Sequence, residues 1–262
     1  MKSLTALFIL SWFSFTAQAI VVGEQLDYTS GGTKLTGYLA FDNSIKGKRP
    51  GILIVHEWWG LNEYARKRAR MLASLGYTAL AIDMYGDGKL ANHPDDASKF
   101  MHEVIDNMPV AHARFNIALD ILKNHPTVKS GDIAAIGYCF GGGIVLEMAR
   151  RGAELDAVVS FHGSLGTKNP AKKGDIKARV LVLNGEDDPF VKPEQIDAFM
   201  NEMNNADVKY HFVSYQGAKH SFTNPDANKL GEQFKLPLAY NPEADEQSWA
   251  EMQKLFKNVF GQ

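Results

Sequence analysis

The one cysteine of the sequence stands where a nucleophile would be exposed. Cys139 lies in the segment Gly137-Tyr138-Cys139-Phe140-Gly141, between an apolar run and a helix-like run. A Gly-x-nucleophile-x-Gly segment at such a junction is typical of the nucleophile elbow, usually with serine. The glycines avoid Cβ clashes at the tight bend, and the helix N-terminus favours a thiolate. The segment therefore indicates covalent attack on a carbonyl carbon, with the N–H of Phe140 directed at the oxyanion. A glycine-rich turn that holds a buried, inert cysteine is the alternative that the segment alone leaves open.

An acid and a histidine follow the cysteine in the order that this architecture requires. Acidic residues, among them Asp187 and Asp188, lie after the apolar run 180–183, and His220 follows the run 209–215. Nucleophile, acid and histidine occur in this order in the fold that carries the elbow. Acids are common in loops and the chain has eight histidines, so each loop alone is weak support. The conjunction of the three predicts a nucleophile–histidine–acid site, although the local pattern does not choose between the two aspartates.

The elements that must position these residues alternate between strands and helices. Short continuous apolar runs are typical of strands buried on both faces, and longer runs show helical periodicity. The alternation predicts a mostly parallel central sheet with helices on both faces. Predicted strands cover residues 24–28, 34–41, 51–55, 78–82, 133–137, 157–161, 180–183 and 209–215; predicted helices cover residues 63–75, 95–105, 110–123, 142–150, 193–204 and 242–259.

Residues 20–262 form a single domain in this interpretation, because no linker or repeat divides them. Residues 224–241, with Pro225 and Pro237, are expected to be a long irregular connection. Long loops in compact domains are often functional, so this segment is a candidate lid; a surface loop without function is the alternative.

Three motifs resemble those of the dienelactone hydrolase family of α/β-hydrolases, which uses cysteine where most relatives use serine. They are GYCFGG around Cys139, GEDDPFV with Asp188 and GAKHSF with His220. The resemblance covers essentially all of the chain after residue 19. It implies an α/β-hydrolase fold, a Cys-His-Asp triad with Asp188 as the acid, and hydrolysis of an ester or lactone through a thioacyl intermediate.

A fourth segment, HEWWGLN at residues 56–62, resembles the family's strand-end segment. The resemblance implies that Glu57 faces the cysteine and takes part in catalysis; a solvent-exposed carboxylate at a strand end is the alternative. It also implies that the N–H of Trp58 completes the oxyanion hole with that of Phe140.

The sequence departs from the family pattern at the substrate. Aromatic-degrading members carry arginines that hold a substrate carboxylate, one of them shortly after the catalytic histidine. Residues 221–224 contain no arginine, and none occurs between Arg70 and Arg114. A neutral small-molecule ester or lactone is therefore the expected substrate. Aromatic residues near the motifs are expected to line its pocket, with core packing as the alternative for each: Trp59, Tyr85 and Phe222.

Two other functions would use the same fold. The first is a binding protein that keeps the fold without turnover. The second is a thiol-redox or sensor protein in which Cys139 is a peroxide-reactive thiolate. The chain has no second cysteine to resolve an oxidised thiol, which favours the hydrolase.

Composition limits the possible partners of this 262-residue chain. It has 28 basic and 30 acidic residues, a net charge of −2, and no basic run, so nucleic acid is not an expected partner. The lone cysteine excludes an intrachain disulfide and a cysteine-based zinc site. The histidines show no ligand spacing and no phosphate loop is present, so no metal or cofactor is expected. We expect a monomer or a small homo-oligomer.

The N-terminus resembles a secretory signal peptide. Lys2 precedes an apolar stretch at residues 4–15, and Ala17-Gln18-Ala19 provides a small-residue cleavage site. The stretch is shorter than the roughly 20 residues that span a bilayer. We expect cleavage after Ala19 and an exported protein, periplasmic or secreted, that does not stay inserted in a membrane. An N-terminal anchor or a buried helix is the alternative.

Overall fold

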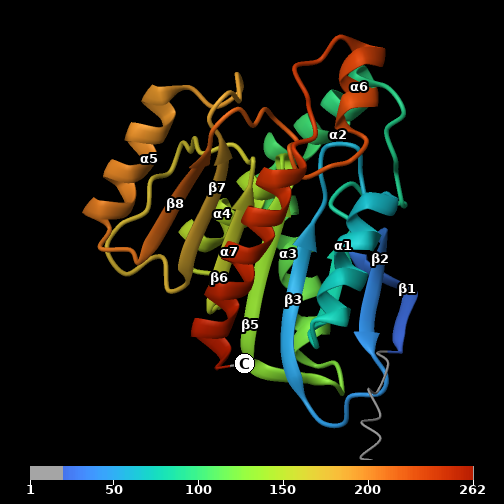
Figure 1. The fold of residues 1–262 in the computed structure, drawn as a ribbon. Coiled ribbons are helices and arrows are strands. Elements are labelled where there is room, and N and C mark those ends of the chain that lie inside the picture. Colours follow the sequence, from blue (N-terminus) through green and yellow to red (C-terminus); the bar gives the residue numbers. More distant parts are fainter. Residues whose placement is uncertain (1–19, 262) are drawn as a thin grey trace, which may run out of the picture.

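An eight-stranded sheet forms the centre of the computed structural model, which describes residues 20–261 (Figure 1). The strand order is β1-β2-β4-β3-β5-β6-β7-β8. The β1–β2 and β2–β4 pairs are antiparallel, and all other neighbours are parallel. The strands are β1 (Val21–Ser30), β2 (Thr33–Asp42), β3 (Arg49–Val55), β4 (Thr78–Ile82), β5 (Val128–Tyr138), β6 (Ala157–Phe161), β7 (Arg179–Gly185) and β8 (Tyr210–Tyr215).

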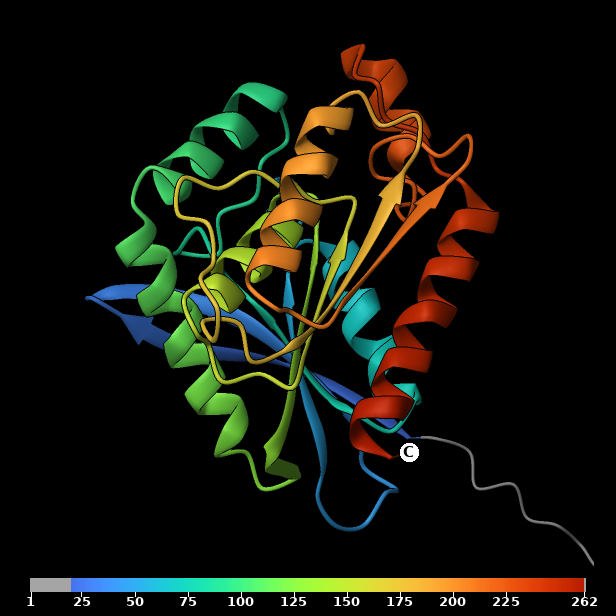
Figure 2. The ribbon, with the colours of Figure 1, turned by 90° about the vertical axis from the view of Figure 1, so that its left-hand side faces the viewer.

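Helices cover both faces of the sheet, as Figure 2 shows. Helices α1 and α7 pack on one face, and α3, α4 and α5 pack on the other. Helices α2 and α6 lie beyond the carboxyl ends of the parallel strands (Figure 1). The helices are α1 (Glu63–Ser74), α2 (Pro94–Ile105), α3 (Met108–Lys123), α4 (Phe140–Arg150), α5 (Pro193–Asn205), α6 (Ala227–Phe234) and α7 (Pro242–Phe260).

The central strands are apolar throughout because each contributes to two cores. In β3, Leu53 and Val55 belong to the core beneath α3 and α4, whereas Ile52 and Ile54 belong to the core beneath α1 and α7. Alternate side chains of a strand point to opposite faces, so a strand covered on both sides needs an unbroken apolar run.

The predicted architecture, a mostly parallel sheet with helices on both faces, is confirmed. Every predicted helix and strand is present, with ends that differ by a few residues; β5 starts earliest relative to its prediction, at Val128. The expectation of an irregular connection at residues 224–241 is wrong in part, because α6 occupies its centre. This helix has only eight residues and follows a proline, so its periodicity is too brief to distinguish it from a loop.

The predicted signal peptide, residues 1–19, lies outside the described residues. Within residues 20–261, no helix is both long enough and apolar enough to cross a membrane.

Candidate active site

Cys139 occupies a strained backbone position between β5 and α4. Its φ and ψ are 52° and −117°, in a region that a residue with a Cβ adopts only when its surroundings enforce it. The surroundings are glycines packed against backbone. A Cβ on Gly137 would lie 2.0 Å from the carbonyl oxygen of Gly141, and one on Gly141 would lie 2.3 Å from that of Val55. The glycines therefore let α4 start close against the ends of β5 and β3, and they leave the thiol half-buried at the helix N-terminus.

His220 and Asp188 form a buried pair at the same edge of the sheet. The Nδ1 atom of His220 lies 2.7 Å from Oδ2 of Asp188, and Oδ1 of Asp188 accepts a hydrogen bond of 2.9 Å from the N–H of Phe190. Asp187 is exposed to solvent, so it is Asp188 that orients the imidazole. The two residues follow β8 and β7, whose carboxyl ends lie side by side.

The charges around His220 favour its protonated form. Burial alone lowers the pKa of the imidazole, but the negative charge of Cys139 and hydrogen bonds with Asp188 and Cys139 outweigh it. Together they raise the pKa of His220 to about 10. The geometry thus favours the imidazolium form of His220.

Glu57 lies in the same region, at the end of β3, and is 2% exposed. Its Oε2 accepts a hydrogen bond of 2.6 Å from Nδ2 of Asn224, while its buried Oε1 has no partner among the described residues. Burial raises the pKa of Glu57, although the hydrogen bond from Asn224 and the charge of His220 oppose the shift. The carboxyl therefore takes up a proton more readily than an exposed glutamate.

A second histidine, His56, fixes the backbone beside Glu57. Its Nε2 accepts from the N–H of Met84 at 3.2 Å, so its Nδ1 donates to the carbonyl oxygen of Glu57, 2.5 Å away. The N–H of Gly60 donates to the same oxygen at 3.2 Å. In a trans peptide the N–H points opposite to the C=O, so these bonds also set the direction of the Trp58 N–H.

The second predicted oxyanion donor is at the start of a helix. Phe140 is the first residue of α4, and the first N–H groups of a helix have no partner within it. Its N–H is therefore available to an anion beside the thiol.

An apolar cavity of about 270 Å³ lies beside the thiol and the imidazole. Cys139 and His220 both line it, and the ring of Phe190 packs edge-on against His220 with 4.9 Å between centroids. His220 is the only ionisable side chain of the lining other than the thiol. Most of the remaining wall is apolar: Trp58, Met101, Phe140, Val191, Leu236 and Leu238.

Three residues predicted to line this pocket lie elsewhere. Trp59, Tyr85 and Phe222 are 4%, 3% and 0% exposed and are absent from the lining. Trp59 packs with Ala91, Ala97 and the α6 region, and Tyr85 donates a hydrogen bond to the carbonyl oxygen of Trp58. All three are core residues, which was the alternative to lining the pocket.

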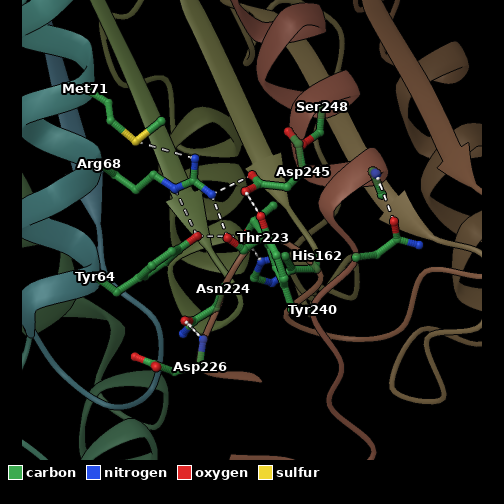
Figure 3. A network of polar contacts seen from close by, with 12 residues as sticks. Tyr64, Arg68, Met71, His162, Thr223, Asn224, Asp226, Tyr240, Asp245 and Ser248 are labelled. Atoms are coloured by element: carbon green, nitrogen blue, oxygen red, sulfur yellow. Dashed lines mark hydrogen bonds and ion pairs between the residues drawn. The ribbon is translucent and has the colours of Figure 1, made fainter. Parts of the chain in front are cut away.

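A buried polar network that begins at the backbone of Cys139 was not predicted. Figure 3 shows its part around Arg68, His162 and Thr223. The N–H of Cys139 donates to Nδ1 of His162 at 3.1 Å, and Nε2 of His162 lies 2.7 Å from Oγ1 of Thr223. That hydroxyl lies 2.6 Å from the hydroxyl of Tyr64. Burial lowers the pKa of His162 well below its ordinary value, so this ring is neutral and its Nδ1 can accept.

The network continues to a buried ion pair between α1 and α7. One guanidinium nitrogen of Arg68 donates to the carbonyl oxygen of Thr223 at 2.6 Å and to Oδ1 of Asp245 at 2.5 Å. The Nε of Arg68 donates to the Tyr64 hydroxyl at 3.3 Å. One sequence signal could have pointed to the network, since His162 directly follows β6 at the strand edge that also carries Cys139.

Among residues 20–261, no group of three or more His, Cys, Asp or Glu side chains is arranged to hold a metal ion.

The strand order, the strained cysteine after β5 and the His–Asp pair after β8 and β7 define an α/β-hydrolase. Comparison with known proteins places it more closely. The model of the dienelactone hydrolase family matches residues 35–260, and the chain belongs to this family of hydrolases.

Two solved structures cover nearly the same length. One, m3DLH, is 41% identical with a TM-score of 0.86, over 91% of this chain and 98% of that one. The other is a dienelactone hydrolase-like promiscuous phosphotriesterase from metagenomic libraries, 38% identical with a TM-score of 0.84 over the same shares of the two chains. Among curated proteins, "Protein usf" of Aquifex pyrophilus is 29% identical over 227 residues, which cover 84% of this chain and 95% of that protein.

Proposed function

We propose that this protein hydrolyses neutral carboxylic esters or lactones with Cys139 as nucleophile, His220 as acid and base, and Asp188 as the group that orients His220. One observation carries the proposal: the thiol and the imidazole share one apolar cavity, and the imidazole is held by a buried carboxylate. Membership of the dienelactone hydrolase family supports the same reaction class.

In the first half of the reaction, the thiolate of Cys139 attacks the carbonyl carbon and a C–S bond forms. The carbonyl π electrons move to the oxygen, where the N–H groups of Phe140 and Trp58 stabilise the charge. Loss of one such donor typically costs about 3 kcal/mol in the transition state. The intermediate then collapses, the C–O bond breaks, and the imidazolium of His220 protonates the leaving alkoxide.

In the second half, water attacks the thioester carbon. The neutral imidazole of His220 takes a proton from the water, and Asp188 stabilises the resulting imidazolium. Collapse of the second intermediate breaks the C–S bond, releases the carboxylic acid and returns the thiolate and imidazolium.

We propose Glu57 as a second group that accepts the thiol proton. Its partly unpartnered, buried carboxyl has a raised pKa, and a raised pKa makes a carboxylate a better base. If Glu57 takes part, Glu57→Gln lowers kcat and alters the acid limb of the pH profile; unchanged kinetics would exclude it.

The cavity supports a neutral substrate. Its lining has no lysine or arginine to hold a carboxylate. Asn224, within the stretch where acid-binding relatives have an arginine, is instead hydrogen-bonded to Glu57. Esters should be cleaved far faster than amides, because the intermediate expels a thiolate more readily than an amine.

The decisive experiment combines kinetics with mass spectrometry. Wild type should hydrolyse p-nitrophenyl acetate, and quenched samples should carry one acetyl group on Cys139; Cys139→Ala should show neither. Iodoacetamide should modify Cys139 in the folded protein, as expected for an accessible thiol. Turnover that persists in Cys139→Ala would overturn the proposal, and a modified thiol without turnover would favour the redox or sensor function.

A second candidate reaction is hydrolysis of neutral phosphotriesters. The neighbour that is 38% identical is described as a promiscuous phosphotriesterase. Attack of Cys139 on phosphorus would develop charge on the phosphoryl oxygen, where the same two N–H groups could stabilise it. Paraoxon belongs in the substrate panel, and a diethylphosphoryl adduct on Cys139 is the expected product of the first step.

We also propose that the enzyme acts outside the cytoplasm. The support is the sequence of residues 1–19 alone. Mature protein recovered from a periplasmic or culture fraction should have Ile20 as its first residue.

A further inference from the structure

A second, larger depression opens directly beside the reaction cavity. It has a volume of about 540 Å³ and lies between α2, the first turns of α4 and the loop 164–169. It shares Met101, Phe140 and Ser164 with the reaction cavity, so the two are adjacent at the predicted oxyanion donor. We call it the side groove.

The wall of the side groove is suited to a hydrocarbon chain. Met101 and Ile105 of α2, Met108 of α3 and Ile144 of α4 supply its apolar surface. Ile105 keeps 38% of its surface exposed, so part of this apolar wall faces solvent. An apolar chain in the side groove would remove this surface from water.

The charged residues of the side groove leave its apolar surface free. Asp106 and Lys168 are exposed to solvent. The carboxylate of Glu147 is already occupied, because it accepts from Thr167 Oγ1 at 3.0 Å and from Arg151 Nε at 3.1 Å. No basic group is buried in the lining, so a polar or anionic head group has no built site there.

The position of His220 assigns the side groove to one half of the substrate. The imidazole must protonate the leaving oxygen, so the alcohol part lies in the part of the cavity walled by His220, Leu236 and Leu238. None of these three lines the side groove. The acyl part, on the other side of the carbonyl carbon, therefore points past Met101 into the side groove.

We propose that the side groove is an acyl-chain subsite and that the preferred substrates are esters of medium-chain fatty acids. This inference rests on the proposed function and names its substrate class. Burial of a methylene gives at most roughly a fourfold gain in kcat/KM. With several methylenes buried, p-nitrophenyl octanoate should exceed p-nitrophenyl acetate in kcat/KM by at least about tenfold.

Two variants test the subsite by different means. Gly143→Leu fills the side groove: the three atoms nearest to a Cβ at this position all belong to Ser164, the nearest at 3.4 Å, so the helix can accept a side chain there. Ile105→Gln makes an exposed part of the wall polar, at a surface position where folding is little affected. Both should lower the octanoate-to-acetate ratio of kcat/KM by about tenfold.

Ile45→Gln is the matched control. Ile45 is 37% exposed, against 38% for Ile105, but precedes β3 at the opposite end of the sheet. It should keep the wild-type ratio. In a second series with constant acetyl group and lengthening alcohol, the two groove variants should behave like wild type.

The outcomes separate the two proposals. A flat or acetate-preferring wild-type profile, an unchanged ratio in both groove variants, or an effect confined to the alcohol series would overturn the acyl subsite. Acetate hydrolysis that depends on Cys139 would still leave the proposed function standing. If no ester is hydrolysed, both proposals fail.

Discussion

The neighbours of one residue, His220, determine the charge of its imidazole. Its imidazole lies between a buried carboxylate and a thiol, so both neighbours favour its protonated form. The pKa of His220 is about 10 in the folded chain, against 6.5 as its ordinary value. An imidazolium with a raised pKa contributes stability that is complete below about pH 6.5 and is lost as the pH rises through about 10.

Removal of the thiol should lower the pKa of His220. In Cys139→Ala the negative charge and one hydrogen bond are gone, while burial, which opposes protonation, remains. Titration of the His220 ring by NMR should give a clearly lower pKa in the variant than in wild type. Equal values would show that the thiolate does not set the charge of the imidazole.

The two neighbouring aspartates provide a matched pair for the orienting role. Asp188→Asn removes the carboxylate that bonds His220 Nδ1, so kcat for p-nitrophenyl acetate should fall by up to about 10⁴-fold. Asp187→Asn alters an exposed side chain one position earlier and should leave kcat near the wild-type value. The assignment is incorrect if the two variants behave alike or in reverse.

At the scale of elements, the elbow depends on helix α4 starting against two strand ends. Gly141 sits where a Cβ would overlap the carbonyl of Val55, whereas Gly143, half a turn later, has room for one. A side chain is therefore excluded at Gly141 and accepted at Gly143, although the sequence shows only a run of three glycines.

This contrast predicts different stabilities for two conservative variants. Gly141→Ala places a Cβ 2.3 Å from a backbone oxygen that cannot move without disturbing β3, so unfolding free energy should fall by about 3 kcal/mol or more. Gly143→Ala makes only an ordinary contact at 3.4 Å and gains helix propensity, so its stability should match or exceed that of wild type. Urea unfolding measures both, and equal losses would contradict the packing argument.

The buried ion pair of Arg68 and Asp245 joins α1 to α7. Asp245→Ala would leave the guanidinium of Arg68, 4% exposed, without its charged partner, at a cost of about 3–5 kcal/mol. Glu63→Ala removes a partner of Arg70 on the exposed side of α1 and should cost at most about 1 kcal/mol. If urea unfolding shows that Asp245→Ala and Glu63→Ala lose similar unfolding free energy, burial of the ion pair does not determine the cost of breaking it.

Local sequence patterns predicted the helices, the strands and the elbow because short stretches of sequence determine each of them. Apolar runs mark β3 and β4, and the glycines around Cys139 are demanded by one bend. The network could not be foretold in this way. Tyr64 meets Thr223 across 159 positions and Arg68 meets Asp245 across 177, and nothing local to any of the four specifies the partner. Aromatic composition likewise could not separate Trp58, which lines the cavity, from Trp59, which does not.

At the scale of the whole molecule, residues 224–241 cover the carboxyl edge of the sheet and close the cavity on one side. Leu236 and Leu238 contribute to the cavity wall. Leu238 pairs with His220 in an isolated parallel bridge, and the N–H of Ala239 donates to the carbonyl oxygen of His220 at 3.2 Å. The segment is thus attached both to the proposed catalytic histidine and, through α6, to Trp59.

Trp59 should therefore control the mobility of this segment without touching the substrate. Its ring packs against Phe234 of α6, with 6.0 Å between centroids, and against Leu230 and Leu236 through the same apolar cluster. Trp59→Ala removes this anchor, so amide hydrogen exchange should accelerate most in residues 227–238 and KM should rise as Leu236 moves from the cavity wall. Trp59→Phe keeps an aromatic contact, so its exchange rates and its KM should lie between those of wild type and those of Trp59→Ala. Exchange that rises uniformly over the chain would indicate general destabilisation, whereas unchanged exchange in α6 would show that the segment is held by other contacts.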